Sequence, residues 1–468
     1  MFPYFFSTRL QTLLLLTSFS LLLFLLLLLL RSSPTSFTVS SAASSSPSPS
    51  PTSLRHLLFG IASSSKSWPR RKELLRLWWR PGLARGIVFL DSPLDPAASG
   101  GVDHTLPPTS VSADTSRFPY SYKGGRRSAV RVARIVKELV EIAGDSEVRW
   151  IVLGDDDTVF VLENLVGTLA KYDWEGWRYI GGRSEIVEQN VKHSFGMAFG
   201  GAGIAISYPL ARVLANVLDS CLVRYPHLYG SDARIFACLA ELGVELTHEP
   251  GFHQIDLRGD ISGLLSAHPL ASLVSLHHLD FVNSLYPDMN QTMALKHFFE
   301  AVNADPGRIL QQTVCYDRLK SRTISISWGY VVQLFEGNLV LTDLLSVPKT
   351  FTQWKRSRNT SSDVYMFNSK EYSRDQCKRP AIFLLKSVSA GKDKIESNYS
   401  RHFWRKCSLI PNSTRSPLLI RVSSQRLNDT VGKASRRHCC DVLPSSSGFI
   451  MKIDIRKCKD NELIAMQP

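Results

Sequence analysis

The stretch WIVLGDDDTVF, residues 150–160, decides the expected fold. Its apolar start predicts a buried strand, and three consecutive carboxylates, Asp155, Asp156 and Asp157, follow at the C-terminal end of that strand. Ligands of open α/β sheets bind just beyond such strand ends. Adjacent acids repel one another unless a cation neutralises them, and Mg²⁺ or Mn²⁺ prefers oxygen ligands. The stretch therefore predicts a site for a metal and a nucleotide diphosphate. The alternative is an acidic loop or helix start before residues 160–169.

Strand and helix signals alternate around this stretch. Apolar runs at 57–62 and 86–90 predict two strands, and a third apolar run at 244–247 lies downstream. Helical periodicity or helix-start signals appear at 70–79, 126–143, 209–222 and 231–242. This alternation predicts an α/β domain over residues 54–289, with a parallel sheet covered by helices.

Beyond about Asn290 the helical signals fade, and short apolar runs appear at 331–335 and 381–385. Six of the eight cysteines gather there as well. We expect residues 290–468 to form a C-terminal accessory domain that is supported by disulfides and is more β than α.

Length and composition limit the possible classes. The chain has 468 residues, a formal net charge of +14, 44% hydrophobic and 21% charged residues. These values exclude a chain that is disordered overall and a protein with many membrane spans, and they allow two or three domains. The sequence contains no nucleic-acid motif, so the charge predicts a solvated basic surface, with room for a local site for an anionic substrate.

The N-terminal segment predicts a membrane anchor. Residues 10–30 carry no charge and are mostly leucine, long enough to cross a bilayer as a helix. Residues 1–9 would then be a cytosolic tail, and the Ser/Pro-rich residues 31–53 a flexible stem. A signal peptide cleaved near Ser41-Ala42-Ala43 is the alternative.

The body of the chain carries features of the secretory pathway. All eight cysteines lie there, together with five glycosylation sequons, at Asn290, Asn359, Asn398, Asn412 and Asn428. Cys221 and Cys238 lie on neighbouring predicted helices and could pair. The adjacent Cys439 and Cys440 are too close to bond each other easily, so each is expected to have its own partner.

Three further segments carry candidate chemistry. Phe199–Ser207 is rich in glycine, which allows a ligand to approach the backbone closely. Asp232 lies in the first turn of a predicted helix, where it is either a general base or a dipole-stabilising acid. His253 follows a Pro-Gly turn and is a candidate metal ligand or a surface residue. His268, His277 and His278 are further candidate ligands among which the sequence does not choose.

Four motifs, WIVLGDDDTVF, FGMAFGGAGIAIS, YGSDARIFACLAELG and LTHEPGFHQID, occur in this order. Together they resemble the Fringe-related glycosyltransferases of the β1,3-transferase family 31, and are most similar to a plant branch once labelled a domain of unknown function. The resemblance extends from about residue 54 to 468. It implies a GT-A fold, a Rossmann-like α/β domain that binds a UDP-sugar through Mn²⁺.

The resemblance also implies residue roles. Asp157 and His253 would hold the metal, and Asp232 would be the catalytic base, although Ser231 replaces the first acid of the family's acidic pair. The donor would contact Asp155, Asp156, Ser63, Ser64, Gly201, Ala202 and Gly203.

The implied activity is inverting transfer of a hexose, galactose or a related sugar, from a UDP-sugar to a hydroxyl of a glycan or glycoconjugate, with a β1,3 linkage expected. The implied location is the Golgi membrane, as a single-pass type II protein with a lumenal body. A catalytically silent carbohydrate-binding or scaffold protein and a glycoside hydrolase are the alternatives. The donor sugar, the acceptor and the oligomeric state remain open.

Overall fold

The computed structural model describes residues 17–18, 20–24, 50–95, 103–144, 147–354, 364–392, 394–403, 417–427 and 436–466. The chain divides into a unit of residues Met1–Ser50 and a compact unit of residues Pro51–Pro468. Most of the expected anchor at 10–30, and all of the stem up to residue 49, lie outside the described residues. Within the described part of the chain, no helix combines the length and the apolar character needed to cross a membrane.

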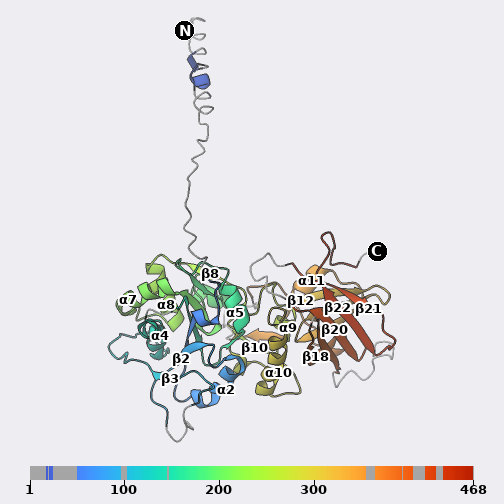
Figure 1. Cartoon of the computed structure of the whole chain (residues 1–468), viewed down its shortest axis with the longest axis horizontal. Coiled ribbons are helices and arrows are strands. Elements are labelled where there is room, and N and C mark those ends of the chain that lie inside the picture. Colours follow the sequence, from blue (N-terminus) through green and yellow to red (C-terminus); the bar gives the residue numbers. More distant parts are fainter. Residues whose placement is uncertain are drawn as a thin grey trace, which may run out of the picture. The chain divides into compact units, whose positions relative to one another are not determined.

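A seven-stranded sheet forms the core of the N-terminal half of the second unit, with the order β3-β2-β1-β4-β7-β6-β8 (Figure 1). Strands β3, β2, β1 and β4 run parallel to one another, whereas β7 runs antiparallel to both β4 and β6. The strands are β1 Leu57–Ala62, β2 Arg85–Leu90, β3 Thr109–Val111, β4 Trp150–Asp155, β6 Tyr179–Gly181, β7 Ile204–Ser207 and β8 Leu246–His248. The expected α/β class with a parallel core is confirmed.

Helices cover both faces of this sheet because successive strand residues alternate between the faces. Leu58 and Ile151 belong to a core cluster that includes residues of α4, α7 and α8, which Figure 1 shows together on one side of the sheet. Phe59 and Val152 belong to a second cluster, with residues of α2 and α5. The helices are α2 Trp68–Trp78, α4 Ser128–Ala143, α5 Leu162–Leu169, α6 Val187–Lys192, α7 Tyr208–Arg224, α8 Ser231–Glu241 and α9 Ser262–Ser266, with short 3-10 turns η1 Leu54–His56, η2 Gly200–Ala202 and η3 Leu279–Phe281.

A helix follows residue 290, where the sequence suggested that helical signals fade. Helix α10 (Gln291–Ala304) begins after Asn290, whose side chain accepts a hydrogen bond from the backbone amide of Met293. An N-cap of this kind satisfies one of the free amides of the first turn. Leu295, Phe298 and Val302 recur at helical spacing and are buried. Residues 291–304 therefore form an amphipathic helix, and the interpretation that helical signals fade beyond Asn290 was wrong for this segment.

An eight-stranded sheet dominates the C-terminal half, with the order β12-β13-β14-β18-β19-β20-β22-β21. Figure 1 shows the labelled strands of this sheet in the part coloured orange to red. Their bounds are β12 Gln312–Asp317, β13 Arg322–Ser327, β14 Val331–Glu336, β18 Ala381–Ala390, β19 Lys394–His402, β20 Leu419–Gln425, β21 Cys439–Leu443 and β22 Ile450–Arg456, with the short helix α11 Leu341–Leu345 and the 3-10 turn η4 Gln376–Lys378 between them.

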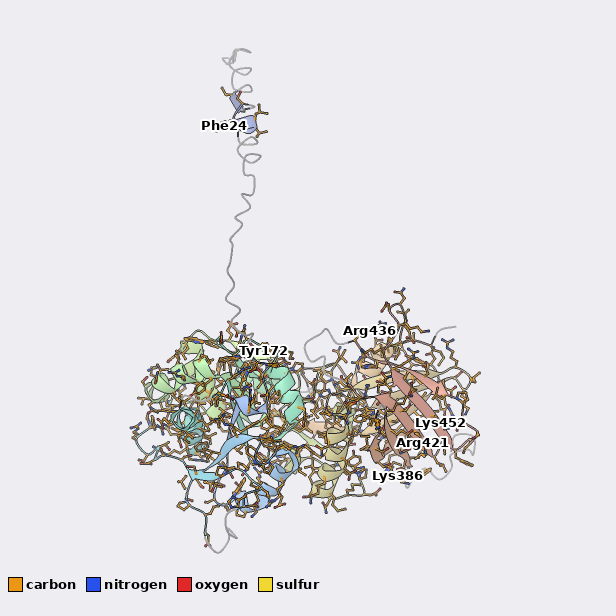
Figure 2. All side chains as sticks on the ribbon, in the orientation of Figure 1. Phe24, Tyr172, Lys386, Arg421, Arg436 and Lys452 are labelled. Carbon is orange, nitrogen blue, oxygen red and sulfur yellow. A yellow bond between two sulfur atoms is a disulfide. The ribbon has the colours of Figure 1, made fainter. Side chains whose placement is uncertain are left out.

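Basic side chains stand on this sheet. Lys386 of β18, Arg421 of β20 and Lys452 of β22 are labelled in Figure 2, and Arg421 lies opposite Lys452 in the strand register. Both lysines are exposed, so part of the net charge of +14 is carried by a solvated sheet face, as the composition suggested.

Disulfides cross-link elements within each half of the chain. Cys221–Cys238 joins α7 to α8, as expected for cysteines on neighbouring helices. Cys439 and Cys440 pair with Cys458 and Cys315 respectively, so the expectation of separate partners is confirmed. Cys377 is also disulfide-bonded. The Cys315–Cys440 bond connects β12 to β21, the two end strands of the eight-stranded sheet.

One small sheet connects the two halves across residue 290. Strand β10 (Leu257–Gly259) pairs with β16 (Phe351–Gln353), and the Ser327 hydroxyl donates to the Leu265 carbonyl at 2.8 Å. The remaining short strands are β5 Val159–Phe160, β9 Phe252–His253 and β11 Ser275–Leu276, which form one sheet, and the pair β15 Val347–Pro348 and β17 Ser369–Lys370. One hydrophobic cluster includes residues on both sides of residue 290, from Leu57 to Ile455.

Candidate functional site

The three aspartates stand at the C-terminal end of β4, next to the end of β1, because Ala62 pairs with Asp155 in the parallel register. Asp156 and Asp157 are buried, whereas 41% of the Asp155 side chain is exposed. Thr158 fixes the turn, since its hydroxyl accepts from the Asp155 amide and donates to the Gly201 carbonyl, both at 2.8 Å. The C-terminal end of β4 thus presents the carboxylates at the position that the sequence predicted.

His277 is the imidazole that meets these carboxylates. Its Nε2 atom lies 3.1 Å from Oδ1 of Asp157 and 3.6 Å from Oδ2 of Asp155. It follows β11, which pairs with β5. Strand β5 begins just after Asp155, Asp156 and Asp157, which are called the acid run below. One ligand atom from each of these three residues lies within 4.8 Å of the others.

The ring of His277 is held by close packing. A Cβ atom on Gly201 would overlap the ring, so only glycine leaves room for it there. On another side, His277 packs against His278 with ring centroids 3.8 Å apart. His278 in turn stacks on Trp354 at 4.4 Å and an interplanar angle of 10°. Trp354 follows β16, so the C-terminal half of the chain supports this imidazole.

The charges of Asp157 and His277 are coupled. Burial alone would lower the pKa of His277, but Asp157 and Asp155 raise it above its ordinary value. Burial alone would raise the pKa of Asp157, but His277 and Arg71 hold it well below the ordinary range. The two side chains therefore behave as a buried ion pair.

This ligand set fits a divalent metal ion. Two carboxylates and one imidazole supply oxygen and nitrogen ligands of the kind that Mn²⁺ and similar ions accept. Three protein ligands also leave coordination positions for water or phosphate oxygens.

Asp232 stands near this cluster, in the first turn of α8. Its Oδ2 atom accepts a weak hydrogen bond from the Gly200 amide at 3.4 Å. Asp232 and Asp155 line one small cavity of about 20 Å³, which is space for about one water molecule. Burial raises the pKa of Asp232 above its ordinary value. A raised pKa suits a carboxylate that has to accept a proton near neutral pH.

The glycine-rich turn lies between His277 and Asp232. Gly200 contacts Asp232 through its amide, and Gly201 contacts His277. The Ala202 amide donates to Oε1 of Gln254 at 2.8 Å, and Gly203 has a φ of 99°, a region that favours glycine. The structure thus brings this predicted segment to the acid run.

Ser63 and Ser64 also lie beside the acid run. The Ser63 hydroxyl donates to Oδ2 of Asp156 at 2.7 Å, and so does the hydroxyl of Ser67. The hydroxyls of Ser64 and Ser67 are hydrogen-bonded at 2.8 Å. Asp156 therefore ties the end of β1 and the start of α2 to the end of β4.

Arg71 of α2 was not singled out from the sequence. Its guanidinium lies 2.7 Å from Asp156, 3.0 Å from Asp157 and 3.3 Å from Asp280. One signal was visible. Arg70, Arg71 and Lys72 follow the helix start, where positive charge opposes the helix dipole, so helix stability does not explain them.

In the structure both ring nitrogens of His253 contact other residues, whereas the resemblance implied that His253 would hold the metal with Asp157. Its Nε2 lies 2.9 Å from Nε2 of His268, and its Nδ1 lies 3.3 Å from Glu185. The strand register explains why His277 rather than His253 meets Asp157 in the structure. His253 pairs with Leu276 on β11, so the next residue, His277, continues to the aspartates.

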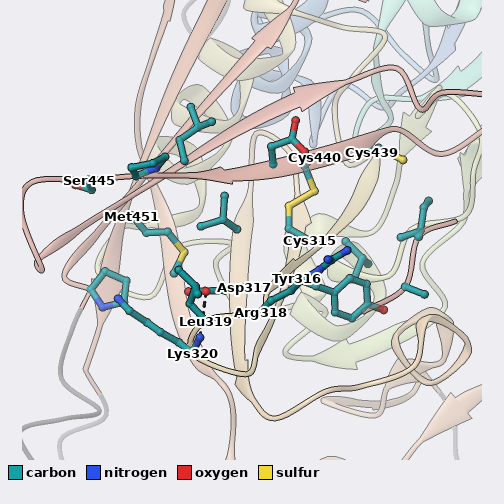
Figure 3. A pocket seen from close by; sticks show the side chains of 18 of the residues that line it. Cys315, Tyr316, Asp317, Arg318, Leu319, Lys320, Cys439, Cys440, Ser445 and Met451 are labelled. Carbon is teal, nitrogen blue, oxygen red and sulfur yellow. Dashed lines mark hydrogen bonds between the residues drawn. A yellow bond between two sulfur atoms is a disulfide. The ribbon is translucent and has the colours of Figure 1, made fainter. Parts of the chain in front are cut away.

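A larger cavity of about 910 Å³ lies in the C-terminal half of the chain, beside the Cys315–Cys440 disulfide (Figure 3). Strands β12 and β21 line it, together with charged residues that include Asp317, Arg318 and Lys320. Its lining shares no residue with the acid run. Size alone does not make it the candidate site, because the cluster around Asp157 combines metal ligands, a nearby carboxylate and a strand-end position.

Two of the five predicted glycosylation sites lie in the described chain. Asn290 is exposed at the start of α10, and Asn398 is half-buried in β19. Asn398 donates to the Ser387 hydroxyl at 3.3 Å and accepts from Nε of Arg421 at 3.2 Å. Asn359, Asn412 and Asn428 lie outside the described residues.

Residues 189–440 match the family model described as "Protein of unknown function, DUF604". The match covers more than half of the chain, so this protein belongs to that family. It includes Asp232 and His277 and begins after the acid run. No curated protein matches the sequence.

Proposed function

We propose that this protein is an inverting, metal-dependent glycosyltransferase of the GT-A type, related to the Fringe enzymes, that uses a UDP-sugar donor. The observation that carries the proposal is the cluster of Asp155, Asp157 and His277 at a parallel strand end, with Asp232 across a small cavity. The ordered sequence motifs, which resemble the Fringe-related family, support the same function.

The protein residues have distinct roles in this proposal. Asp155, Asp157 and His277 would hold a divalent ion such as Mn²⁺, which when bound supplies positive charge to the diphosphate leaving group. Asp232 accepts the proton of an acceptor hydroxyl while that oxygen forms a bond to the anomeric carbon of the sugar. The bond from this carbon to the diphosphate breaks, and UDP leaves. Attack from the opposite face inverts the anomeric configuration, so a UDP-α-hexose gives a β-linked product.

The acceptor is a glycan or glycoconjugate hydroxyl in this proposal, and a β1,3 linkage is the expected product. The N-terminal segment at 10–30 would anchor the protein in the Golgi membrane, with the body in the lumen. The five sequons and the disulfides support a secretory location.

Thermal unfolding tests the function directly. UDP with Mn²⁺ is expected to raise the melting temperature of the wild-type protein, because a ligand that binds only the folded state stabilises it. The Asp157→Ala variant is expected to lose this shift. A screen of UDP-sugars for Mn²⁺-dependent hydrolysis then identifies the donor. A glycoside hydrolase would need no nucleotide, and a silent binding protein would hydrolyse no donor, so either pattern would contradict the proposal.

A further inference from the structure

One face of the eight-stranded sheet points away from the hydrophobic core. Side chains alternate along β19, and Ile395 and Tyr399 belong to the core cluster. Asn398 and Ser400 point to the opposite side of the sheet, which is called the outer face below, and both are half-buried. Arg421 of β20 also stands on the outer face, since it lies opposite Asn398 in the strand register.

Three aliphatic side chains form a row across the outer face. Leu384 of β18 lies opposite Ser400, and Ser400 lies opposite Leu419 of β20. Leu419 in turn lies opposite Ile450 of β22. Leu384, Leu419 and Ile450, which are called the apolar row below, are only half-buried. Contiguous apolar side chains that water reaches favour association with another surface unless something covers them.

Asn398 stands beside the apolar row and begins the sequon Asn398-Tyr399-Ser400. Ser400 lies between Leu384 and Leu419 in the register, so both leucines are diagonal neighbours of Asn398. Diagonal neighbours of this kind are about 7–8 Å apart. Sugars attached to the Asn398 amide would therefore reach the side chains of the row.

Among the described residues, the hydrogen bonds of Asn398 leave one N–H for a covalent bond. A carboxamide carries two N–H donors and one carbonyl acceptor. Nδ2 of Asn398 donates to the Ser387 hydroxyl at 3.3 Å, and Oδ1 accepts from Nε of Arg421 at 3.2 Å. An N-glycosylated amide keeps one N–H and its carbonyl oxygen, so both hydrogen bonds would survive the modification. The side chain would then stay fixed on the outer face.

We propose that Asn398 carries an N-linked glycan whose first sugars lie across the apolar row and shield it from water. This inference rests on the secretory location within the proposed function. In the modification, Nδ2 loses a proton and forms a bond to the anomeric carbon of the first sugar. The bond from that carbon to a lipid diphosphate breaks, so the co-reactant is an oligosaccharide carried on a lipid diphosphate.

The chemistry of a pyranose ring suits this surface. The ring has an apolar C–H face, which would contact Leu419, and a rim of hydroxyls. The hydroxyls would meet Lys452, which is exposed and lies opposite Arg421 (Figure 2). A glycan linked to its own binding surface is present there at high effective concentration, so a free partner would have to displace it.

Two variants each remove a sequon and keep its asparagine, because the sequon needs a hydroxyl two residues further on. Ser400→Ala removes the sequon at Asn398 and keeps both hydrogen bonds of that side chain. Thr292→Ala removes the sequon at Asn290, and the Asn290 side chain still caps α10. Thr292 is exposed at the start of that helix, so Thr292→Ala is the matched control.

Mass spectrometry of the full chain from a eukaryotic secretory host tests the modification. Wild-type protein is expected to carry the glycan at Asn398 in most molecules. Hydroxyl-radical labelling of the folded protein then measures the access of solvent to Leu384 and Leu419. Labelling of these leucines is expected to rise about twofold or more in Ser400→Ala, because a bulky glycan is gone. Thr292→Ala is expected to leave it unchanged.

The outcomes separate this inference from the proposed location. An unmodified Asn398 beside an occupied Asn290 would overturn this inference and leave the secretory location intact. An occupied Asn398 with unchanged leucine labelling in Ser400→Ala would overturn the shielding role. The absence of glycan from every sequon would overturn the secretory location together with this inference. Asn398→Gln provides the same labelling test if Ser400→Ala does not fold.

Discussion

Nε2 of His277 lies 3.1 Å from Oδ1 of Asp157, although the two residues come from distant segments of the chain. The short sheet of β5, β9 and β11 makes this contact, because β11 pairs with the strand that directly follows the acid run. His253, one strand away in the same sheet, contacts His268 instead.

Replacement of each histidine distinguishes their roles. His277→Ala is expected to lower Mn²⁺ affinity by about tenfold or more, because a direct ligand is removed. His253→Ala is expected to leave Mn²⁺ affinity within about threefold of the wild type, since in the structure its ring contacts Glu185 and His268. Calorimetry with Mn²⁺ measures both values. The reverse order of effects would show that His253 is the metal ligand.

Asp232→Asn tests the catalytic base. The variant keeps the shape of the side chain, so UDP and Mn²⁺ binding should persist while sugar transfer falls by about a hundredfold or more. Transfer is measured with the donor that the UDP-sugar screen selects, and binding is measured by thermal shift. Full transfer by the variant would remove Asp232 from the mechanism. Loss of binding together with transfer would indicate a structural role.

The close packing at Gly201 makes a third prediction. Gly201→Ala places a methyl group where the His277 ring stands, so the ring has to shift and Mn²⁺ affinity should fall. Overpacking of this kind costs about 1–3 kcal/mol of stability. Gly200→Ala is the control, because a Cβ there would meet only Asp232 at an ordinary 3.6 Å. Equal Mn²⁺ affinities of the two variants would contradict this packing argument.

The Cys315–Cys440 disulfide is expected to contribute strongly to stability. It closes a sequence separation of 125 residues, and the loss of such a cross-link commonly costs about 2–5 kcal/mol. The double variant Cys315→Ser with Cys440→Ser should therefore lower the free energy of unfolding in urea. The corresponding change at Cys221 and Cys238, with a separation of 17 residues, should cost less in the chain-entropy view. A larger loss at the second pair would contradict that view.

Acid is expected to destabilise the fold through His438. Burial, with nearby Arg308 and Lys457, lowers the pKa of His438 from 6.5 to about 4. Between these two values the unfolded chain binds more protons than the folded chain, so stability falls as the pH decreases through this window. The contribution is fully present above pH 6.5 and is lost towards pH 4. His438→Gln should flatten the pH dependence of the melting temperature. An unchanged slope would exclude His438 as a source.

The acid run could be predicted because the strand that positions it and the aspartates themselves are contiguous in the sequence. Strand β4 runs from Trp150 to Asp155, and Asp156 and Asp157 follow it directly, so one short segment defines both the element and its end. The glycine-rich turn and Asp232 likewise lie next to the elements that position them. These residues appear in the structure close to the predicted site.

His277 and Arg71 could not be selected in the same way. Four candidate histidines lie between residues 253 and 278, and a one-residue change of strand register decides which of them reaches Asp157. Arg71 reaches the acid run because α2 packs against β5, which directly follows the acid run, and this is a tertiary relationship. Trp354 shows the same limit, since its place behind His278 depends on the pairing of β10 with β16.

The bond between β12 and β21 has a consequence for the handling of this protein. The two end strands of an eight-stranded sheet would otherwise be free to recruit strands from other molecules, which is a common route to aggregation. Cys315–Cys440 ties one edge to the other. A strong reductant would release both edges together, so the folded body is expected to remain monodisperse only where its thiols stay oxidised.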